Sequence, residues 1–274
     1  MSTYLKWAGN KRRIVARIQA ELPPGRRLLE PFVGSGAVFL HTDYPCYLLA
    51  DANGDLINLH RRLQAEGEPF IAFCRTFFTP ENNRPERYYH FRALFNETED
   101  LRLKAALFLY LNRHGYNGLC RYNAKGGFNV PFGRYRRPYF PAEEMRAFHR
   151  KSQHGVVFRQ ADYLTVLAEA GAGDVVYCDP PYVPLSTTAN FTSYDANGFS
   201  MADQERLAQA ARAAAARGAH VVISNHCTPV TLALYAGARI VRFPVSRTIS
   251  ANIHSRNPVT ELLAVFVGAG EEEF

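Results

Sequence analysis

Residues 175–182, VVYCDPPY, join an apolar run to a carboxylate, two prolines and a tyrosine. The apolar run is typical of a buried parallel strand, so the acid stands where that strand ends. The prolines fix the backbone. The peptide bond that follows Pro180 has no N–H group, so nothing on it disturbs the exposed Pro180 carbonyl. A carboxylate and a carbonyl that accept both hydrogens of an aromatic amine, such as adenine N6, would free its lone pair for attack on a sulfonium methyl. The reaction is an in-line displacement that depends mainly on alignment. We predict these catalytic residues: Asp179, Pro180, Pro181 and Tyr182, the last as a stacking face for the base.

A second candidate site follows the apolar segment 27–32, RLLEPF. Gly34 and Gly36 allow a sharp turn and a close approach of the backbone to a ligand. A further strand-like segment, 46–50, ends on Asp51, whose carboxylate can accept hydrogen bonds from ribose hydroxyls. Ligands of open α/β sheets bind beyond the carboxyl ends of the strands, which would bring these residues and Asp179 together. A dinucleotide-binding turn is disfavoured because Phe39 stands where its third glycine belongs.

The remaining elements predict how these residues are positioned. Helical spacing dominates 55–64, 88–95 and 101–113, and an alanine-rich helix is expected over 201–217 with Ser200 as its N-cap. Strand-like runs recur at 156–158, 174–178 and 220–224, and 239–245 can pair with 261–267 as a terminal edge. We expect a doubly wound, Rossmann-like α/β sheet. The catalytic domain would comprise 1–54 and 142–274, and a mainly helical recognition domain, 55–141, would be inserted into it.

Composition narrows the class of protein. The 274 residues include 32 Lys and Arg against 25 Asp and Glu, a formal charge of +7 that favours a polyanionic partner. The five cysteines are scattered and the nine histidines lack metal-ligand spacing, so we predict a reduced cytoplasmic protein without a metal. The basic first 20 residues do not resemble a signal peptide, and the longest apolar run is too short to span a membrane.

The segment 113–137 has the composition of a nucleic-acid surface. Six basic residues and no acid occur in it, interleaved with rings that can stack on bases. The basic residues are Arg113, Arg121, Lys125, Arg134, Arg136 and Arg137, and the rings include Tyr116, Tyr122, Phe128 and Tyr135. A second polar segment, 246–258, contains Arg247 and Arg256. The sequence leaves open whether it braces the active site, grips phosphate or is a plain surface loop.

The chain resembles the Dam family of DNA adenine-N6 methyltransferases, the D12 class, along nearly its whole length. The matching motifs are LKWAGNK (5–11), LLEPFVGSGAVFL (28–40), LLADAN (48–53), LFLYLNRHGYNGLCRYN (107–123), FNVPFGRY (128–135) and VVYCDPPYVPLS (175–186). One departure is Asn10, where the family usually has a second glycine; asparagine tolerates a positive φ better than most residues.

The resemblance implies S-adenosyl-L-methionine as methyl donor, double-stranded DNA as partner and extrusion of adenine from GATC. It implies that Trp7, Lys11, Asp51 and Asp179 contact the cofactor, and we add Phe32, Gly34, Gly36 and Asp162. The bases of GATC would lie near Lys6, Tyr116, Asn117, Leu119, Arg121 and Pro131, and we add Arg113, Asn123, Arg134 and Tyr135. An arginine such as Arg121 can fork onto guanine, and Pro131 can touch a thymine methyl. We expect a nucleoid-associated enzyme without an obligatory protein partner.

The sequence is compatible with two alternatives. A related enzyme would methylate an amino group of RNA or of a protein glutamine, although the glutamine enzymes typically begin the tetrapeptide with asparagine. The other alternative is a DNA-binding module that keeps the fold without catalysis; the intact cofactor motifs argue against it.

Overall fold

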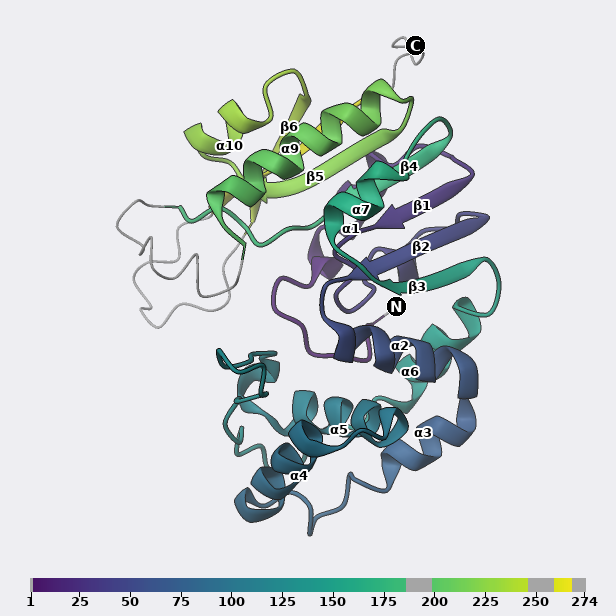
Figure 1. Cartoon of the computed structure of the whole chain (residues 1–274), viewed down its shortest axis with the longest axis vertical. Coiled ribbons are helices and arrows are strands. Elements are labelled where there is room, and N and C mark those ends of the chain that lie inside the picture. Colours follow the sequence, from purple (N-terminus) through teal and green to yellow (C-terminus); the bar gives the residue numbers. More distant parts are fainter. Residues whose placement is uncertain (1, 186–198, 246–258, 268–274) are drawn as a thin grey trace. The chain divides into compact units, whose positions relative to one another are not determined.

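The computed structural model describes residues 2–185, 199–245 and 259–267 (Figure 1). The described strands are β1 (Arg27–Glu30), β2 (Cys46–Asp51), β3 (Val156–Gln160), β4 (Asp174–Cys178), β5 (His220–His226), β6 (Arg239–Val245) and β7 (Val259–Phe266). The described helices are α1 (Val15–Ala20), α2 (Gly54–Glu66), α3 (Glu68–Arg75), α4 (Pro85–Glu97), α5 (Leu101–His114), α6 (Ala142–Lys151), α7 (Tyr163–Ala168), α9 (Met201–Ala216) and α10 (Pro229–Leu234). Three short 3-10 turns are η1 (Lys11–Arg13), η2 (Phe39–His41) and η3 (Tyr116–Gly118).

The chain forms two compact units. Unit 1 consists of Met1–Ala16, Val33–Asp43 and Asp51–Gln160, and unit 2 of Arg17–Phe32, Tyr44–Ala50 and Ala161–Phe274. The recognition domain expected from the sequence, 55–141, falls within unit 1, whose bounds are wider. The predicted domain division itself stays a prediction.

The strands form one sheet in the order β3-β2-β1-β4-β5-β7-β6. Strands β2, β1, β4 and β5 pair in parallel, whereas β7 runs antiparallel between β5 and β6. The strand order reverses between β1 and β4, and ligands of such sheets bind at the carboxyl ends of the strands at this point. The mixed α/β class with a Rossmann-like sheet is therefore confirmed, as is the pairing of the last two strands.

The core of unit 2 lies between the sheet and the helices α7 and α9. All five residues of β4 are buried, as expected for a central parallel strand. Helix α9 places small alanines against the strands, with Ala208, Ala211 and Ala214 in the same apolar cluster as Val176 and Val221. The helix begins at the predicted N-cap, Ser200, whose hydroxyl accepts the N–H of Asp203 in a capping box.

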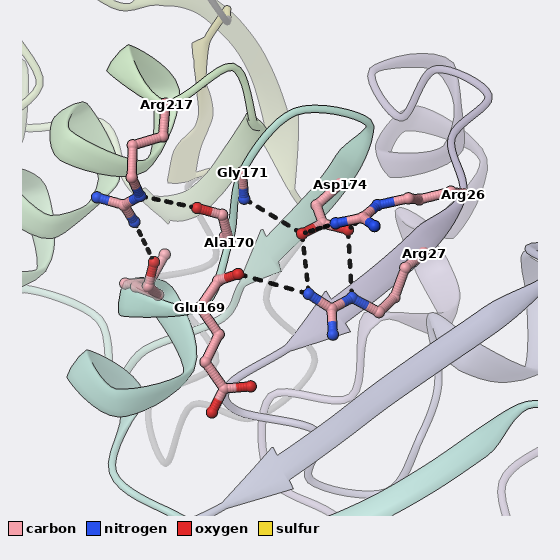
Figure 2. Close-up of polar contacts among 8 residues, drawn as sticks. Arg26, Arg27, Glu169, Ala170, Gly171, Asp174 and Arg217 are labelled. Atoms are coloured by element: carbon pink, nitrogen blue, oxygen red, sulfur yellow. Dashed lines mark hydrogen bonds and ion pairs between the residues drawn. The ribbon is translucent and has the colours of Figure 1, made fainter.

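The amino ends of β1 and β4 are joined by a buried carboxylate (Figure 2). Asp174 Oδ2 lies 2.9 Å from Arg27 Nη2, and its Oδ1 lies 3.1 Å from Arg26 Nε. The backbone N–H of Gly171 also donates to Asp174. Burial by itself raises the pKa of Asp174, but the hydrogen bonds from Arg27, Gly171 and Arg26 outweigh burial and hold the pKa below its usual value. This ion pair fixes the end of the sheet opposite to the carboxyl ends.

Unit 1 is built around α5, in which every residue from Ala105 to His114 is buried. Asp100 caps the helix by accepting the N–H groups of Arg102 and Leu103. Aromatic rings from α4 pack on it, with Phe91 at 5.1 Å from the ring of Tyr110. Because ten consecutive residues are buried on every side of the helix, α5 forms the centre of the unit.

Candidate functional site

The acidic corner, which we define as Asp179–Tyr182, directly follows β4 in unit 2. The parallel register pairs Cys178 with Ile223 and so brings Ser224 beside Asp179. Ser224 Oγ lies 2.9 Å from Asp179 Oδ1, and the phenol oxygen of Tyr177 lies 3.0 Å from Ser224 Oγ. Burial, then the charge of Asp179, raises the pKa of Tyr177 well above its usual value, so the phenol keeps its proton. Tyr177 therefore donates to Ser224, and Ser224 donates to the carboxylate.

The phenol of Tyr182 is held by β5 and β7. Its hydroxyl donates to Glu261 Oε2 at 3.4 Å, and its ring meets His226 edge-on at 4.9 Å. His226 and Glu261 are directly paired across the antiparallel strands. Burial, then the negative charges of Asp179 and Glu261, raises the pKa of Tyr182 well above its usual value. The ring is thus a neutral aromatic face in a fixed position.

Two further predicted cofactor residues belong to unit 2. Phe32, just after β1, stacks on Tyr163 at 5.5 Å and meets Phe199 edge-on at 5.7 Å. Asp162 caps α7 through the N–H of Leu164 and is otherwise exposed. Their roles in cofactor binding stay predictions.

The glycine turn of unit 1 is organised by Asp51, the last residue of β2. Gly34 and Gly36 have φ values of 49° and 73°, which a residue with a side chain rarely adopts. Asp51 Oδ2 accepts the N–H of Gly34 at 3.1 Å, and its Oδ1 accepts the N–H of Asn53 at 3.0 Å. Each carboxylate oxygen keeps acceptor capacity for a hydroxyl, so Asp51 can accept hydrogen bonds from the hydroxyls of a ribose.

A buried histidine supports the same turn and was not found by the sequence reasoning. His60 Nε2 lies 2.9 Å from the carbonyl oxygen of Gly34, and its Nδ1 lies 2.6 Å from the phenol oxygen of Tyr4. Because a carbonyl only accepts, Nε2 carries the hydrogen and Nδ1 accepts from Tyr4. Burial lowers the pKa of His60 to about 4, which keeps the ring neutral. A lone histidine on an amphipathic helix gives no signal of this contact.

The N-terminal motif surrounds this turn. A Cβ added to Gly34 would lie 2.7 Å from the indole nitrogen of Trp7, so only glycine fits beneath that ring. Lys11 is buried, and its Nζ donates to the carbonyl of Gly9. Asn10 does not use the positive φ that asparagine tolerates: its φ is −51°, and its side chain caps η1 by accepting the N–H of Arg12. Gly9 supplies the positive φ instead, at 74°.

In the predicted recognition surface, one buried amide holds several residues together. Asn112 accepts the N–H of Lys6 and donates to the carbonyls of Lys6 and Gly118. The ammonium of Lys6 lies 3.7 Å from the ring centre of Tyr135. The hydroxyl of Tyr135 in turn accepts the N–H of Asn117, which has a left-handed backbone with φ 53°. Lys6, Asn117 and Tyr135 are therefore neighbours, and their contacts with DNA stay predictions.

A second contact ties the recognition segment to Asn53, two residues after Asp51. Asn53 caps α2, and its amide nitrogen lies 3.3 Å from Cys120 Sγ. The hydroxyl of Tyr122 donates to Asp55 at 2.7 Å and lies 3.5 Å from Asn53 Oδ1. The backbone N–H of Asn53 donates to the carboxylate of Asp51, so Asn53 contacts both the recognition segment and Asp51.

The other predicted DNA residues differ in exposure. Arg121 is exposed, and its Nε donates to Asn129 Oδ1 at 2.7 Å. Arg113 is 7% exposed and donates to the carbonyl of Tyr4, so its guanidinium serves the fold; its DNA contact stays a prediction. Asn123 shapes the turn to Gly127 by accepting backbone N–H groups. Tyr116, Pro131 and Arg134 are exposed, and Leu119 is half-buried.

Three further predictions concern the segment 246–258, a metal ion and membrane spans. Arg247 and Arg256 lie outside the described residues. Within residues 2–185, 199–245 and 259–267, acidic, histidine and cysteine side chains do not cluster in threes as a metal ion needs. Helices of that same part of the chain are too short or too polar to cross a membrane.

Comparison with known proteins places these motifs in a family. The DNA adenine methylase of Vibrio cholerae serotype O1 is 52% identical over 96% of this chain and 95% of its own. The DNA adenine methylase of Escherichia coli K12 is 48% identical over 96% of this chain and 94% of its own. Among solved structures, the rRNA methyltransferase aviRa from Streptomyces viridochromogenes aligns with a TM-score of 0.39 and 14% identity, covering 93% of this chain and 84% of that one.

The family model that matches covers residues 7–249, which include the glycine turn, the recognition segment and the acidic corner. Both relatives align over almost the full length of each chain. The chain therefore belongs to the D12 class N6 adenine-specific DNA methyltransferases.

Proposed function

We propose that this DNA adenine-N6 methyltransferase modifies the adenine of GATC after extruding it from the duplex into the acidic corner. S-adenosyl-L-methionine supplies the electrophilic methyl carbon. The two DNA adenine methylases at about 50% identity support the reaction, and the motifs shared with the Dam family support GATC. The predicted cytoplasmic, nucleoid-associated location stays a prediction.

The observation that carries the proposal is the fixed carboxylate of Asp179. Ser224 donates to its Oδ1, which orients the group at the carboxyl end of β4. A carboxylate and the Pro180 carbonyl, both acceptors only, suit the two hydrogens of an exocyclic base amine such as adenine N6. Accepting both hydrogens draws the nitrogen toward pyramidal geometry and frees its lone pair. The methylated amine sheds its proton readily, so no strong base is needed.

Tyr182 supplies the second requirement, which is a face for the extruded base. Its ring is half-buried and held by His226 and Glu261, so little side-chain entropy is lost when a base stacks on it. Stacking of a base on an aromatic ring contributes about 1–3 kcal/mol. That gain offsets part of the few kcal/mol that extrusion costs.

The glycine turn of unit 1 supplies groups for the methyl donor. Asp51 faces the turn with acceptor capacity for ribose hydroxyls, and Trp7 covers Gly34. In the same unit, Lys6, Asn117 and Arg121 present a cation, an amide and a guanidinium for base edges. The two sets of groups support the predicted division of labour between cofactor and DNA.

The test is methylation of a plasmid, followed by digestion with nucleases that require or are blocked by methylated GATC. The wild type should protect every GATC site, and Asp179→Ala should protect none while keeping its thermal unfolding midpoint. Glu205→Gln, an exposed acid on α9, is the matched control and should behave as wild type. Retained methylation by Asp179→Ala refutes the role of the corner.

Tritiated methyl transfer to matched DNA, RNA and protein glutamine substrates separates the alternative acceptors. Calorimetry with S-adenosyl-methionine tests the non-catalytic alternative, which predicts no binding. Methylation at a sequence other than GATC would contradict the recognition proposal and leave the reaction standing.

A further inference from the structure

Behind the acidic corner, three buried polar side chains form a network that no step of the proposed reaction uses. Gln204 of α9, Asn225 of β5 and Tyr235 after α10 are each 0% exposed. Buried amides are costly unless their hydrogen bonds are made, so a connected group of them next to an active site requires a reason. All three belong to unit 2, as the corner does.

The network contacts the backbone on both sides of Tyr182. Gln204 Nε2 lies 2.7 Å from the carbonyl oxygen of Pro181. Asn225 Oδ1 lies 2.9 Å from the backbone nitrogen of Val183. The carbonyl before Tyr182 and the N–H after it are thus bound to residues of α9 and β5.

Hydrogen-bond logic fixes the orientation of both amides. Asn225 Oδ1 receives two backbone N–H groups, from Val183 and His226, so its nitrogen must point the other way. That nitrogen lies 3.3 Å from Gln204 Oε1 and 3.0 Å from the phenol oxygen of Tyr235. The Gln204 oxygen therefore faces donors, and its nitrogen faces the Pro181 carbonyl. A flipped amide at either residue would oppose two groups of the same kind.

We propose that Gln204, oriented by Asn225 and Tyr235, is a positioning residue for methyl transfer. By holding the Pro181 carbonyl, it fixes the peptides on each side of Pro181, and with them the direction of the Pro180 carbonyl toward the adenine amine. The inference rests on the proposed function, because it concerns the corner assigned there to the base. Gln204 itself touches neither base nor methyl donor.

The decisive experiment measures single-turnover methyl transfer at saturating S-adenosyl-methionine and GATC duplex. Gln204→Met should lower the rate about 10- to 100-fold, since misplacement by roughly 1 Å costs this much. Its dissociation constants for methyl donor and duplex should stay within about 3-fold of wild type, because binding groups are unchanged. Gln209→Met makes the same change on an exposed face of α9 and should have no effect.

Gln204→Glu provides a second measurement, the pH dependence of the rate, which would not change if Gln204 had a merely structural role. Buried beside a carbonyl, the new carboxyl has a raised pKa; its protonated form can donate to Pro181 and its ionised form cannot. The ratio of its rate to that of wild type should rise as pH falls from about 8.5 to 6, while the same ratio for Gln204→Met stays flat. This variant also keeps the test available if Gln204→Met does not fold.

The outcomes separate the two proposals when Asp179→Ala is measured alongside. Wild-type rates in Gln204→Met, or a flat rate ratio for Gln204→Glu, overturn the positioning role. Rate losses matched by equal losses in duplex affinity also overturn it. An active Asp179→Ala overturns the assignment of the corner itself, whereas an inactive one with normal Gln204 variants overturns only the present inference.

Discussion

His60 donates its Nε2 hydrogen to the carbonyl of Gly34, the residue whose N–H is accepted by Asp51. Gly34 is thus held through both of its backbone groups, one by a carboxylate that we assign to the methyl donor and one by a buried imidazole. Because the two contacts act on one glycine, loss of the imidazole contact should lower the affinity for the cofactor.

His60→Phe should weaken binding of S-adenosyl-methionine by about 10-fold. Phenylalanine keeps the stacking on Phe148 and Phe158 but leaves the Gly34 carbonyl without its donor, a loss of about 1–1.5 kcal/mol. Isothermal calorimetry measures the affinity. The exposed His90 on α4 offers the control His90→Phe, which should bind like wild type. Equal affinity in His60→Phe would show that the turn holds without the imidazole.

Acid should destabilise unit 1 through two buried histidines. Burial lowers the pKa of both His60 and His114 to about 4, from an ordinary value of 6.5. Between these values the unfolded chain binds more protons than the folded one, so stability falls as pH falls from about 6.5 to 4. Each histidine contributes a slope of up to about 1.4 kcal/mol per pH unit.

Urea unfolding at pH 7, 6 and 5 measures this slope. His60→Phe and His114→Phe should each unfold with a shallower pH dependence than wild type, whereas His90→Phe should match it. A His60→Phe protein with the full wild-type slope would rule out His60 as a source of the acid sensitivity.

Tyr122→Phe should uncouple the recognition segment from the cofactor turn. In the wild type, Tyr122 and Cys120 contact Asn53, whose N–H binds Asp51, so duplex binding should raise affinity for S-adenosyl-methionine and the reverse. We expect coupling of roughly 5-fold, reduced toward 1 in the variant with little change in either single affinity. Calorimetric titrations with and without GATC duplex measure it.

Tyr139→Phe is the matched control, because Tyr139 also donates to a carboxylate, that of Glu144, without contacting Asn53. It should keep the wild-type coupling. Coupling that survives in Tyr122→Phe would mean that the two sites communicate by another route.

Arg121→Ala should relax the choice of one base pair in GATC by about 1–3 kcal/mol. The guanidinium is exposed and braced by Asn129, which suits a fork onto guanine. Methylation rates on duplexes with single substitutions in GATC measure the loss. Arg136→Ala, in the same segment, should weaken binding uniformly and reduce the salt slope by about 1. Uniform weakening by Arg121→Ala would identify it as a phosphate contact.

Asp174→Ala should lower the free energy of unfolding by about 1–3 kcal/mol without changing the rate per folded molecule. The carboxylate is fully buried and joins β1 to β4 at the end of the strands opposite to the acidic corner (Figure 2). Arg26→Met should cost less than Arg27→Met, because the Arg26 side chain is 66% exposed against 27% for Arg27. A slower reaction at equal folded fraction would contradict this purely structural role.

The sequence predicted the framework because that framework depends on local patterns. The bounds of β4 and β6 and the N-cap of α9 agree with expectation, and the glycine turn has the predicted backbone. Helix α6 was missed, although Met145 and Phe148 are buried at helical spacing. What could not be predicted are polar side chains whose partners lie far along the chain. Arg113 reaches Tyr4, and Gln204 reaches Pro181, through contacts that no local pattern encodes.

Strand β7 has a consequence for how the enzyme is made. It enters the sheet between β5 and β6, and its Glu261 binds the phenol of Tyr182, which the ribosome has synthesised 79 residues earlier. A nascent chain that has not yet delivered β7 lacks both the strand that joins β6 to the sheet and one support of the stacking face. We therefore expect partly translated chains to be inactive and methylation capacity to arise late in synthesis.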